Sequence, residues 1–460
     1  MGVRSRKALP LDIEGWLSYI QTIHSRSIDL TLERVRRVAH CMKLAPTVPV
    51  ITVAGTNGKG SVVNFCQRVL TAHGLSVGSY TSPHLVRYGE RICWNGQAVD
   101  NKTLLDAFQA VETARKHIPL TYFEFGTLAA MYLFCQWQVE VIVLEVGLGG
   151  RLDATNIWSS DVSVITAIDH DHESWLGTTR WAIAREKAGI LRYGRPAVIG
   201  DPKPPLPLVD RARELRCQGL FIGVEFSGEV TSEGWDWRAP YARQGLSPRD
   251  VSGLPKPKEW LEPHVRNAAT ALTALVQLEP LITISMKKVR QVLAEWSLPG
   301  RLQRIPGAVD QLFDVAHNPA AIRTLAQCLE GSSTSSKTRA VFALFGDKDL
   351  DQIVKILDSW VDHWYVAGLA GDRAVPAEAL AVAIGRIARG GTSPYADPVT
   401  AYRAAMKDAR PGERIVVFGS FQVVGAILSL VDGETWLPCG ARAGAPFCQP
   451  NEGLGSRTDG

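Results

Sequence analysis

The segment VITVAGTNGKGSV, at residues 50–62, is the part of this 460-residue chain that says most about its fold. An apolar β-branched run leads into a glycine-rich turn and then into a helical pattern, which is the order of a parallel strand-turn-helix unit. Backbone N–H groups of such a turn can surround phosphate oxygens, and Lys59 can reach the terminal phosphates. The turn departs from the common phosphate-loop pattern, because Gly60 separates Lys59 from Ser61. A tight turn with chance glycines is the alternative, which the position of Lys59 between two glycines disfavours.

Outward from this stretch, short apolar runs of strand character alternate with longer helical patterns. Such alternation predicts an α/β fold built on a parallel sheet. The interval 201–260 breaks the alternation with proline-rich segments, KPPLPL and LPKPKEW, and predicts an irregular, strand-rich insertion. The predicted strands are 48–54, 139–146, 162–167 and 197–199, and the predicted helices are 62–72, 181–191 and 267–278.

The length of the chain is about three times the commonest domain size, which favours two domains. A Pro-Gly pair in LPGR, residues 298–301, has the composition of a linker. We therefore expect a larger domain over residues 1–297 and a smaller Rossmann-like α/β domain over 298–432. Residues 433–460 lack periodicity and predict a disordered tail. The smaller domain has predicted strands at 311–315, 340–345 and 415–418 and predicted helices at 320–329 and 350–360.

Composition excludes several classes of protein. Apolar residues make up 46% and charged residues 21% of the chain, as in an ordinary folded, water-soluble protein. A formal charge of +4 is too small to argue for a nucleic-acid partner. The eight cysteines form no CxxC pair and predict reduced thiols. No secretory signal is recognisable, and the apolar run 415–431 is too short and too interrupted for a membrane span, so we expect a cytoplasmic protein without a membrane partner.

Two further strand ends carry groups that bind cations. Glu145 ends the apolar run VIVLE, and a carboxylate there needs either a metal ion or a partner such as Arg151. His172 follows the next predicted strand, and Lys187 lies in the helix after it. His172 by itself is most simply a solvated loop residue. Because Lys59, Glu145 and His172 follow three successive strands of one predicted sheet, we expect them to share a site.

The smaller domain has one comparable strand end, in LFDVAHNP at residues 312–319. Asp314 could accept a hydrogen bond from a ribose, and His317 could orient a reacting phosphate or carboxylate. The alternative is an Asn-Pro turn that only starts a helix. The spacing by itself favours neither of these two interpretations.

Taken together and in this order, the motifs closely resemble the bacterial folylpolyglutamate synthase and dihydrofolate synthase family, a branch of the Mur ligase superfamily. The resemblance spans roughly residues 16–431. It implies a P-loop-containing, Mur-ligase-like ATP-binding domain, a smaller C-terminal domain and an active site between them. The motifs are AGTNGKGS (54–61), TSPHLVRYGERI (81–92), LTYFEFGT (120–127), LEVGLGGRLDATN (144–156), DHESWLG (171–177), REKAGI (185–190), LPGR (298–301) and DVAHNP (314–319).

The resemblance also implies a reaction and its residues. ATP activates a pterin-linked carboxylate as an acyl phosphate, and the amine of L-glutamate displaces phosphate. ATP binding would fall on Thr56, Asn57, Gly58, Lys59, Gly60, Ser61, Asn267, Arg301 and Asp314. Mg²⁺ would be held by Ser82, Glu145 and His172, and a second Mg²⁺ by Lys187 as a carbamate, while His317 would orient the intermediate. The pterin pocket would comprise Ser27, Ile28, Asp29, Thr121, Tyr122, Phe123, Asp153 and Ala154.

The expected substrates are dihydropteroate or a reduced folate, together with L-glutamate, and the expected protein is a monomer. Gln422 and Gly346 stand where the family usually has histidine, which bears on glutamate handling and not on the reaction. Three alternatives stay open: a monofunctional folylpolyglutamate synthase, another Mur-type amide ligase, and a nucleotide-binding regulator without ligase activity. The two ligase alternatives are disfavoured by the pterin-pocket motifs, and the regulator by the joint presence of Glu145, His172, Lys187 and His317.

Overall fold

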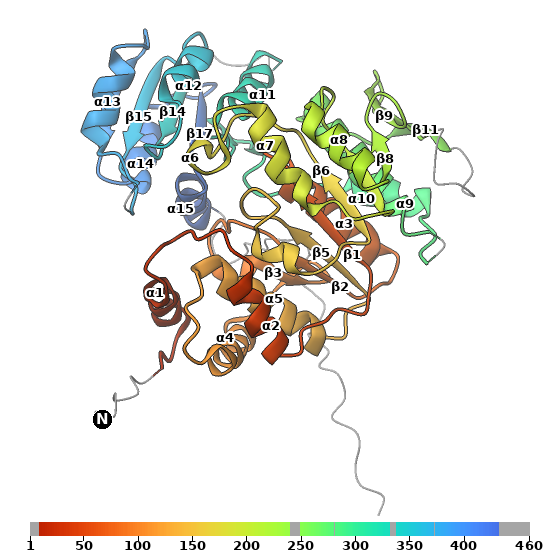
Figure 1. Ribbon diagram of the computed structural model, residues 1–460. Helices are drawn as coiled ribbons and strands as arrows, with labels where there is room; N and C mark the ends of the chain where they lie inside the picture. Colours follow the sequence, from red (N-terminus) through yellow and green to blue (C-terminus); the bar gives the residue numbers. More distant parts are fainter. Residues whose placement is uncertain (1–8, 240–248, 280, 332–336, 372, 432–460) are drawn as a thin grey trace, which may run out of the picture.

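A computed structural model describes residues 9–239, 249–279, 281–331, 337–371 and 373–431 of the chain. The predicted tail at 433–460 lies outside the described residues. Two units follow one another along the chain, each built around its own sheet (Figure 1).

The larger unit is built around an eight-stranded sheet in which six neighbouring strands run parallel, and two further strands, β3 and β4, extend it at one end through antiparallel pairings. The central strand has the sequence VITVA and is buried at every position, as expected of a parallel strand covered on both faces. In spatial order the strands are β4 (Gln97–Ala98), β3 (Ile92–Trp94), β2 (Val77–Tyr80), β5 (Val141–Glu145), β1 (Val50–Ala54), β6 (Val162–Ile165), β7 (Pro196–Ile199) and β8 (Gln218–Phe221).

Helices cover both faces of this sheet, and alternate residues of each strand join different cores. Ile51 and Val53 pack with the helices of one face, whereas Val50 packs with those of the other. The first face carries α3 (Lys59–Ala72), α9 (Glu262–Val276) and α10 (Met286–Ala294). The second carries α1 (Ile13–Ile23), α2 (Glu33–Cys41), α4 (Asn101–Arg115), α5 (Tyr122–Gln136), α7 (Arg180–Lys187) and α8 (Leu206–Glu214). Short helical turns are η1 (Tyr88–Arg91), η2 (Ala154–Ile157), α6 (Glu173–Leu176) and η3 (Ala188–Ile190).

The prediction of an irregular insertion over 201–260 was wrong for its first part. Leu206–Glu214 forms α8, and β8 continues the main parallel sheet. Pro205 is the N-cap of α8 and Pro207 lies in its first turn, where a proline loses no helical hydrogen bond. The prolines that indicated a break therefore mark a helix start. The second part is strand-rich as expected, with β9 (Ser227–Val230), β10 (Trp235–Ala239) and β11 (Arg249–Leu254) in an antiparallel sheet.

The smaller unit has a six-stranded sheet with one antiparallel edge strand, β12. In spatial order the strands are β12 (Gln303–Ile305), β13 (Asp310–Phe313), β17 (Arg414–Phe418), β14 (Thr338–Phe342), β15 (His363–Ala367) and β16 (Gly391–Tyr395). One face carries α11 (Pro319–Glu330), α12 (Leu350–Leu357) and α13 (Ala377–Gly385), and the other carries α14 (Pro398–Asp408) and α15 (Phe421–Val431). The strands and helices predicted for both units, outside 201–260, are confirmed.

The two units are joined by polar contacts near the carboxyl ends of their strands. Nζ of Lys348 lies 2.5 Å from a carboxylate oxygen of Asp171, and both side chains are more than nine-tenths buried. The amides of Asn57 and Asn318 exchange two hydrogen bonds, of 3.1 and 2.9 Å. In Figure 1 the smaller unit, coloured from teal to blue, lies beside α6 of the larger unit, and α15 is its helix nearest to the larger unit.

Two predictions from composition concern the described residues directly. Their six cysteines are all free thiols, as expected, while Cys439 and Cys448 lie outside the described part. Over the same residues, no helix combines the length and the apolar character that crossing a membrane requires. The run at 415–431 is instead β17 followed by α15.

Candidate active site

The glycine-rich turn after β1 has the geometry that its sequence predicts. Gly58 has a φ of +92°, and a Cβ there would lie 2.5 Å from Oδ1 of Asn267, so a side chain is excluded both by strain and by contact. Helix α3 begins at Lys59, which places the positive end of its dipole at the turn. Thr56 ties the turn to the loop after β6, because its hydroxyl and the backbone of Asp169 exchange hydrogen bonds of 3.0 Å.

Two lysine amines lie against the same backbone carbonyl. Nζ of Lys59 donates to the oxygen of Gly55 at 3.1 Å, and Nζ of Lys187 donates to it at 2.7 Å. Lys187 is 4% exposed. Burial, and then the charge of Lys59, lower the pKa of Lys187 to about 7. The site therefore holds one lysine amine that is readily deprotonated near neutral pH.

Glu145, at the end of β5, is buried, and its Oε2 accepts a hydrogen bond of 3.2 Å from the backbone N–H of Ser82. Gly60 adjoins this carboxylate, since a Cβ on Gly60 would lie 3.6 Å from Oε2. The alternative pairing with Arg151 is not formed, because Arg151 binds Glu186. Burial raises the pKa of Glu145, and nearby cations oppose that rise. A buried carboxylate with unused lone pairs is suited to a cation.

The loop after β6 carries His172 in a left-handed conformation, with a φ of +53°. Burial lowers the pKa of His172 to about 4, which leaves the neutral imidazole that binds metals. Its neighbour Asp171 contacts His317 at 3.7 Å as well as Lys348. Although burial by itself raises the pKa of Asp171, the contact with His317 and the nearby cations hold it well below its usual range.

These side chains line one cavity of about 450 Å³ between the two units. The three predicted strand-end residues do converge, because β5, β1 and β6 are neighbours in the sheet. The predicted site residues on the cavity wall are Ser27, Ile28, Asp29, Thr56, Asn57, Gly58, Lys59, Gly60, Ser82, Thr121, Tyr122, Phe123, Glu145, Asp153, Ala154, His172, Lys187, Arg301 and His317.

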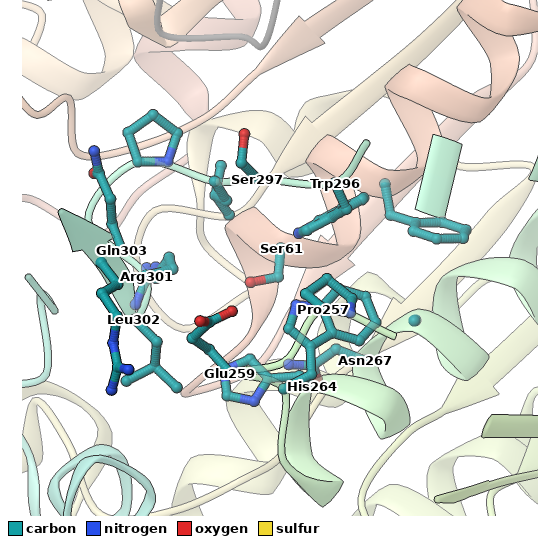
Figure 2. Close-up of a pocket in the computed structure, with 16 residues that line it drawn as sticks. Ser61, Pro257, Glu259, His264, Asn267, Trp296, Ser297, Arg301, Leu302 and Gln303 are labelled. Atoms are coloured by element: carbon teal, nitrogen blue, oxygen red, sulfur yellow. The ribbon is translucent and has the colours of Figure 1, made fainter. Parts of the chain in front are cut away.

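A second cavity, of about 260 Å³, lies on the other side of the glycine-rich turn. Ser61, Asn267 and Arg301 are the predicted residues that line it, and Arg301 lines both cavities. Figure 2 shows the ring of Trp296 beside Ser61, with Arg301, Leu302 and Gln303 on the opposite side. The aromatic and proline walls suit a flat ring.

Asp314, the remaining predicted nucleotide ligand, is engaged with backbone. Its Oδ2 accepts from the N–H of Leu302 at 2.8 Å and its Oδ1 from that of Ala316 at 2.7 Å. The first bond holds the residue that follows Arg301, and the second shapes the turn after β13. Asp314 therefore supports the segment next to Arg301 and is not itself among the residues that line the two cavities.

The predicted pterin segments are held by hydrogen bonds and ion pairs within the protein. Thr121 caps α5 in a reciprocal capping box with Glu124. The carboxylate of Asp153 accepts four hydrogen bonds from its own loop, three of them from backbone N–H groups. Asp29 is paired with Arg34 at 3.1 Å, and Arg34 also binds Glu124 at 3.1 Å.

Several residues of the site were not predicted. Asp171 is the first residue of the motif DHESWLG, and Lys348 lies in the segment GDKD at 346–349, but nothing local indicates that they pair. Arg91 lies in the motif TSPHLVRYGERI and lines the larger cavity, yet it was given no role. Of the two departures from the family, Gln422 is exposed on α15, whereas Gly346 donates its N–H to the oxygen of Arg373.

The donor set fits the metal that the resemblance implies. Ser82, Glu145 and His172 supply a hydroxyl, a carboxylate and a neutral imidazole on one cavity wall. Among the described residues, no group of three or more His, Cys, Asp and Glu side chains gathers as a metal site. The expected set is compatible with that finding, because one of its three donors is a serine.

Comparisons with known proteins agree with the geometry. Residues 300–421 match the family model "Mur ligase, glutamate ligase domain". The dihydrofolate synthase/folylpolyglutamate synthase of Escherichia coli (strain K12) is 41% identical over 423 residues, which cover 92% of this chain and 96% of that protein. The structure of E. coli FolC in complex with DHPP and ADP aligns with a TM-score of 0.84 at 40% identity, covering 92% of this chain and 98% of that one.

A further similar structure contains bound L-glutamate. It is a bifunctional folylpolyglutamate synthase/dihydrofolate synthase with Mn, AMPPNP and L-glutamate bound, and it aligns with a TM-score of 0.83 at 40% identity. The alignment covers 93% of this chain and all of that one. By this similarity over nearly its whole length, the chain belongs to the dihydrofolate synthase/folylpolyglutamate synthase family.

Proposed function

We propose that this protein is an ATP-dependent ligase that joins L-glutamate to 7,8-dihydropteroate and to reduced folates. In the first step a carboxylate oxygen of the pterin substrate attacks the γ-phosphorus of ATP, and ADP leaves. In the second, the amine of glutamate attacks the acyl carbon, inorganic phosphate leaves, and the amine loses a proton. The product is an amide.

The observation that carries this proposal is the convergence of two kinds of residue on one cavity. Lys59, Glu145 and His172 lie at the carboxyl ends of adjacent strands, and the pterin segments at 27–29 and 121–123 lie on the wall of the same cavity. His317 reaches that cavity from the smaller unit. A nucleotide-binding regulator would need the phosphate-binding residues, but it would not need the predicted pterin segments in the same cavity.

The chain's own residues would lower the repulsion between two anionic reactants. ATP and the carboxylate are both negative, so their approach requires fixed positive charge. Lys59 and the N–H groups at the start of α3 supply that charge for the phosphates, with Arg301 between the two cavities. The smaller cavity, with Trp296 and Asn267 on its wall, is the proposed place of the adenine ring.

Two Mg²⁺ ions complete the proposed site. Ser82, Glu145 and His172 would hold one, and Lys187, carbamylated by carbon dioxide, would hold the other. Mg²⁺, when bound, neutralises phosphate charge and orients the γ-phosphoryl group. Lys187 is suited to carbamylation because burial and the charge of Lys59 favour its neutral amine, the form that reacts with carbon dioxide.

We infer that the protein acts as a cytoplasmic monomer. Support comes from the six described cysteines, which are free thiols as in proteins of reducing compartments. The site is assembled from the two units of a single chain, with Asp171 and Lys348 paired across their boundary.

The deciding experiment offers ATP, Mg²⁺ and glutamate with dihydropteroate or with tetrahydrofolate in separate reactions. Glutamate-containing product is expected from both. Product from tetrahydrofolate only would make the enzyme a monofunctional folylpolyglutamate synthase, and ATP binding without product from either would favour the regulator. Lys59→Ala is the control, because removing this loop cation should abolish both reactions while circular dichroism shows an unchanged fold.

A further inference from the structure

A buried arginine on the cavity wall has no part in the roles assigned above. Arg91 is 9% exposed. Its guanidinium carbon lies 5.1 Å from the ring centre of Tyr88 and 5.4 Å from that of Tyr122. Its Nε donates to Nδ1 of His84 at 2.9 Å. Two rings and one hydrogen bond thus fix the plane and the direction of this cation.

The two terminal nitrogens of Arg91 are not engaged by the part of the chain that the structure describes. Within the described part of the chain, only Nε of Arg91 has a hydrogen-bond partner, and no carboxylate forms an ion pair with the side chain. Arg91 lines the 450 Å³ cavity. A buried guanidinium without an anion is costly, so its presence in a fixed orientation indicates a site for an anion that comes from outside the chain.

The position of Arg91 identifies that anion. On one side it stacks on Tyr122, part of the proposed pterin wall, and on the other its charge reaches Glu145 at the phosphate end. A pteroate whose pterin lies against residues 121–123 must extend its aromatic carboxylate past Tyr122 to meet the γ-phosphate near Lys59. Arg91 contacts the first of these two ends through Tyr122 and interacts electrostatically with Glu145 at the second.

We propose that Arg91 binds the reacting carboxylate of the pterin substrate through its two terminal nitrogens. The inference rests on the proposed function and adds a carboxylate subsite to it. A guanidinium pairs with both oxygens of a carboxylate in one plane, and each oxygen keeps a further lone pair for attack on phosphorus. Arg91 would thus hold the nucleophile in place without blocking it.

The test compares dihydropteroate with its carboxamide, in which the charge is removed and the rest of the molecule is kept. Binding is measured by calorimetry without nucleotide, so that catalysis is not needed. The parent protein should prefer the acid by about tenfold to hundredfold, the usual size of a charged hydrogen-bonded pair. Arg91→Gln should lose that preference and bind the carboxamide as the parent does.

Arg115→Gln is a matched control. Arg115 is also buried beside a tyrosine, 6.0 Å from the ring centre of Tyr19, but it pairs with Glu112 in a contact away from the cavity wall. Its replacement should leave the preference for the acid unchanged, whatever it does to stability. Should Arg91→Gln fail to fold, Arg91→Lys carries the test, because an ammonium keeps the charge but loses the planar fork and should reduce the preference about tenfold.

Two results would overturn the inference in distinguishable ways. A parent protein that binds neither compound refutes the proposed pterin substrate, and the subsite falls with it. A parent that binds both, with Arg91 variants that retain the preference for the acid or lose both ligands equally, leaves the ligase intact and shows that Arg91 only supports the fold.

Discussion

Replacing Lys187 tests whether its amine acts as a carbamate or as an ordinary cation. The side chain is buried, and its Nζ shares the carbonyl of Gly55 with Nζ of Lys59. Lys187→Glu restores an anionic oxygen at this place, whereas Lys187→Arg restores a positive charge. We expect the glutamate variant to retain more ligase activity than the arginine variant, and added bicarbonate to help only the parent enzyme.

The expected extent of reaction follows from the pKa of about 7 for Lys187. At about pH 7, roughly half of the side chains are then neutral, whereas an ordinary lysine with a pKa near 10.4 would be neutral in only about four of ten thousand. Burial and the neighbouring cation therefore raise the reactive fraction about a thousandfold. Because the neutral amine reacts with carbon dioxide, carbamylation should rise with pH through about 7 at constant carbon dioxide pressure.

Nuclear magnetic resonance with ¹³C-enriched carbon dioxide measures the carbamate directly. One signal should be present in the parent and absent from Lys187→Arg, and its midpoint should move to higher pH in Lys59→Met, because a repelling charge has been removed. The reasoning is refuted by a midpoint near ten, by a midpoint that Lys59→Met leaves in place, or by an arginine variant more active than the glutamate variant.

Three further predictions concern the metal, the contact between the units and the smaller cavity. Glu145→Ala and His172→Ala should each raise the Mg²⁺ concentration needed for half-maximal rate. Both variants should bind dihydropteroate normally in the absence of nucleotide. An unaltered Mg²⁺ dependence in both variants would contradict the proposal that these two side chains hold the metal. Lys348→Met leaves the buried carboxylate of Asp171 without its cation and should lower the free energy of unfolding by about 3 kcal/mol, measured as a lower urea midpoint. As a control, Arg389→Met removes an ion pair whose arginine is 78% exposed and should lower it by less than about 1 kcal/mol. Equal losses in the two variants would show that burial does not strengthen the Lys348 pair. Burial, helped by nearby cations, lowers the pKa of His264 to about 4. Between about pH 6.5 and 4 the unfolded chain therefore binds a proton that the folded chain does not, and the free energy of unfolding should fall by roughly 1–3 kcal/mol as the pH is lowered through that range. His264→Gln should reduce this pH dependence of stability in denaturation experiments.

The sequence predicts the site best where a short sequence pattern allows only one arrangement in space. Carboxyl ends of neighbouring parallel strands meet at one edge, so the sequence by itself predicts that Lys59, Glu145 and His172 lie together. The same rule required β5, β1 and β6 to be adjacent, and they are. Gly58 was expected in a phosphate turn, but the contact that excludes a side chain there, with Asn267, comes from a helix about two hundred residues later in the chain.

Proline shows how one residue type supports opposite conclusions. KPPLPL at 203–208 suggested broken structure, since proline interrupts helices and central strands. Its ring is nevertheless compatible with the first turn of a helix, where Pro207 lies, and with the N-cap before it, which is Pro205 of α8. Only the apolar residues that follow, such as Leu208 on the buried face, distinguish the two cases, and nine residues give that pattern little statistical weight.

The ion pair between the two units, Asp171 with Lys348, could not be predicted from local sequence patterns. Asp171 and Lys348 are 177 residues apart, and nothing in the sequence around either residue indicates the other as its partner. What brings them together is the packing of one unit on the other, which depends on surfaces contributed by many elements. Because His317 and Arg301 reach the cavity from the same side of that boundary, the ion pair does more than stabilise. A weakened pair would withdraw the smaller unit's groups from the phosphate turn, so the cost of Lys348→Met should appear in the ligation rate as well as in stability.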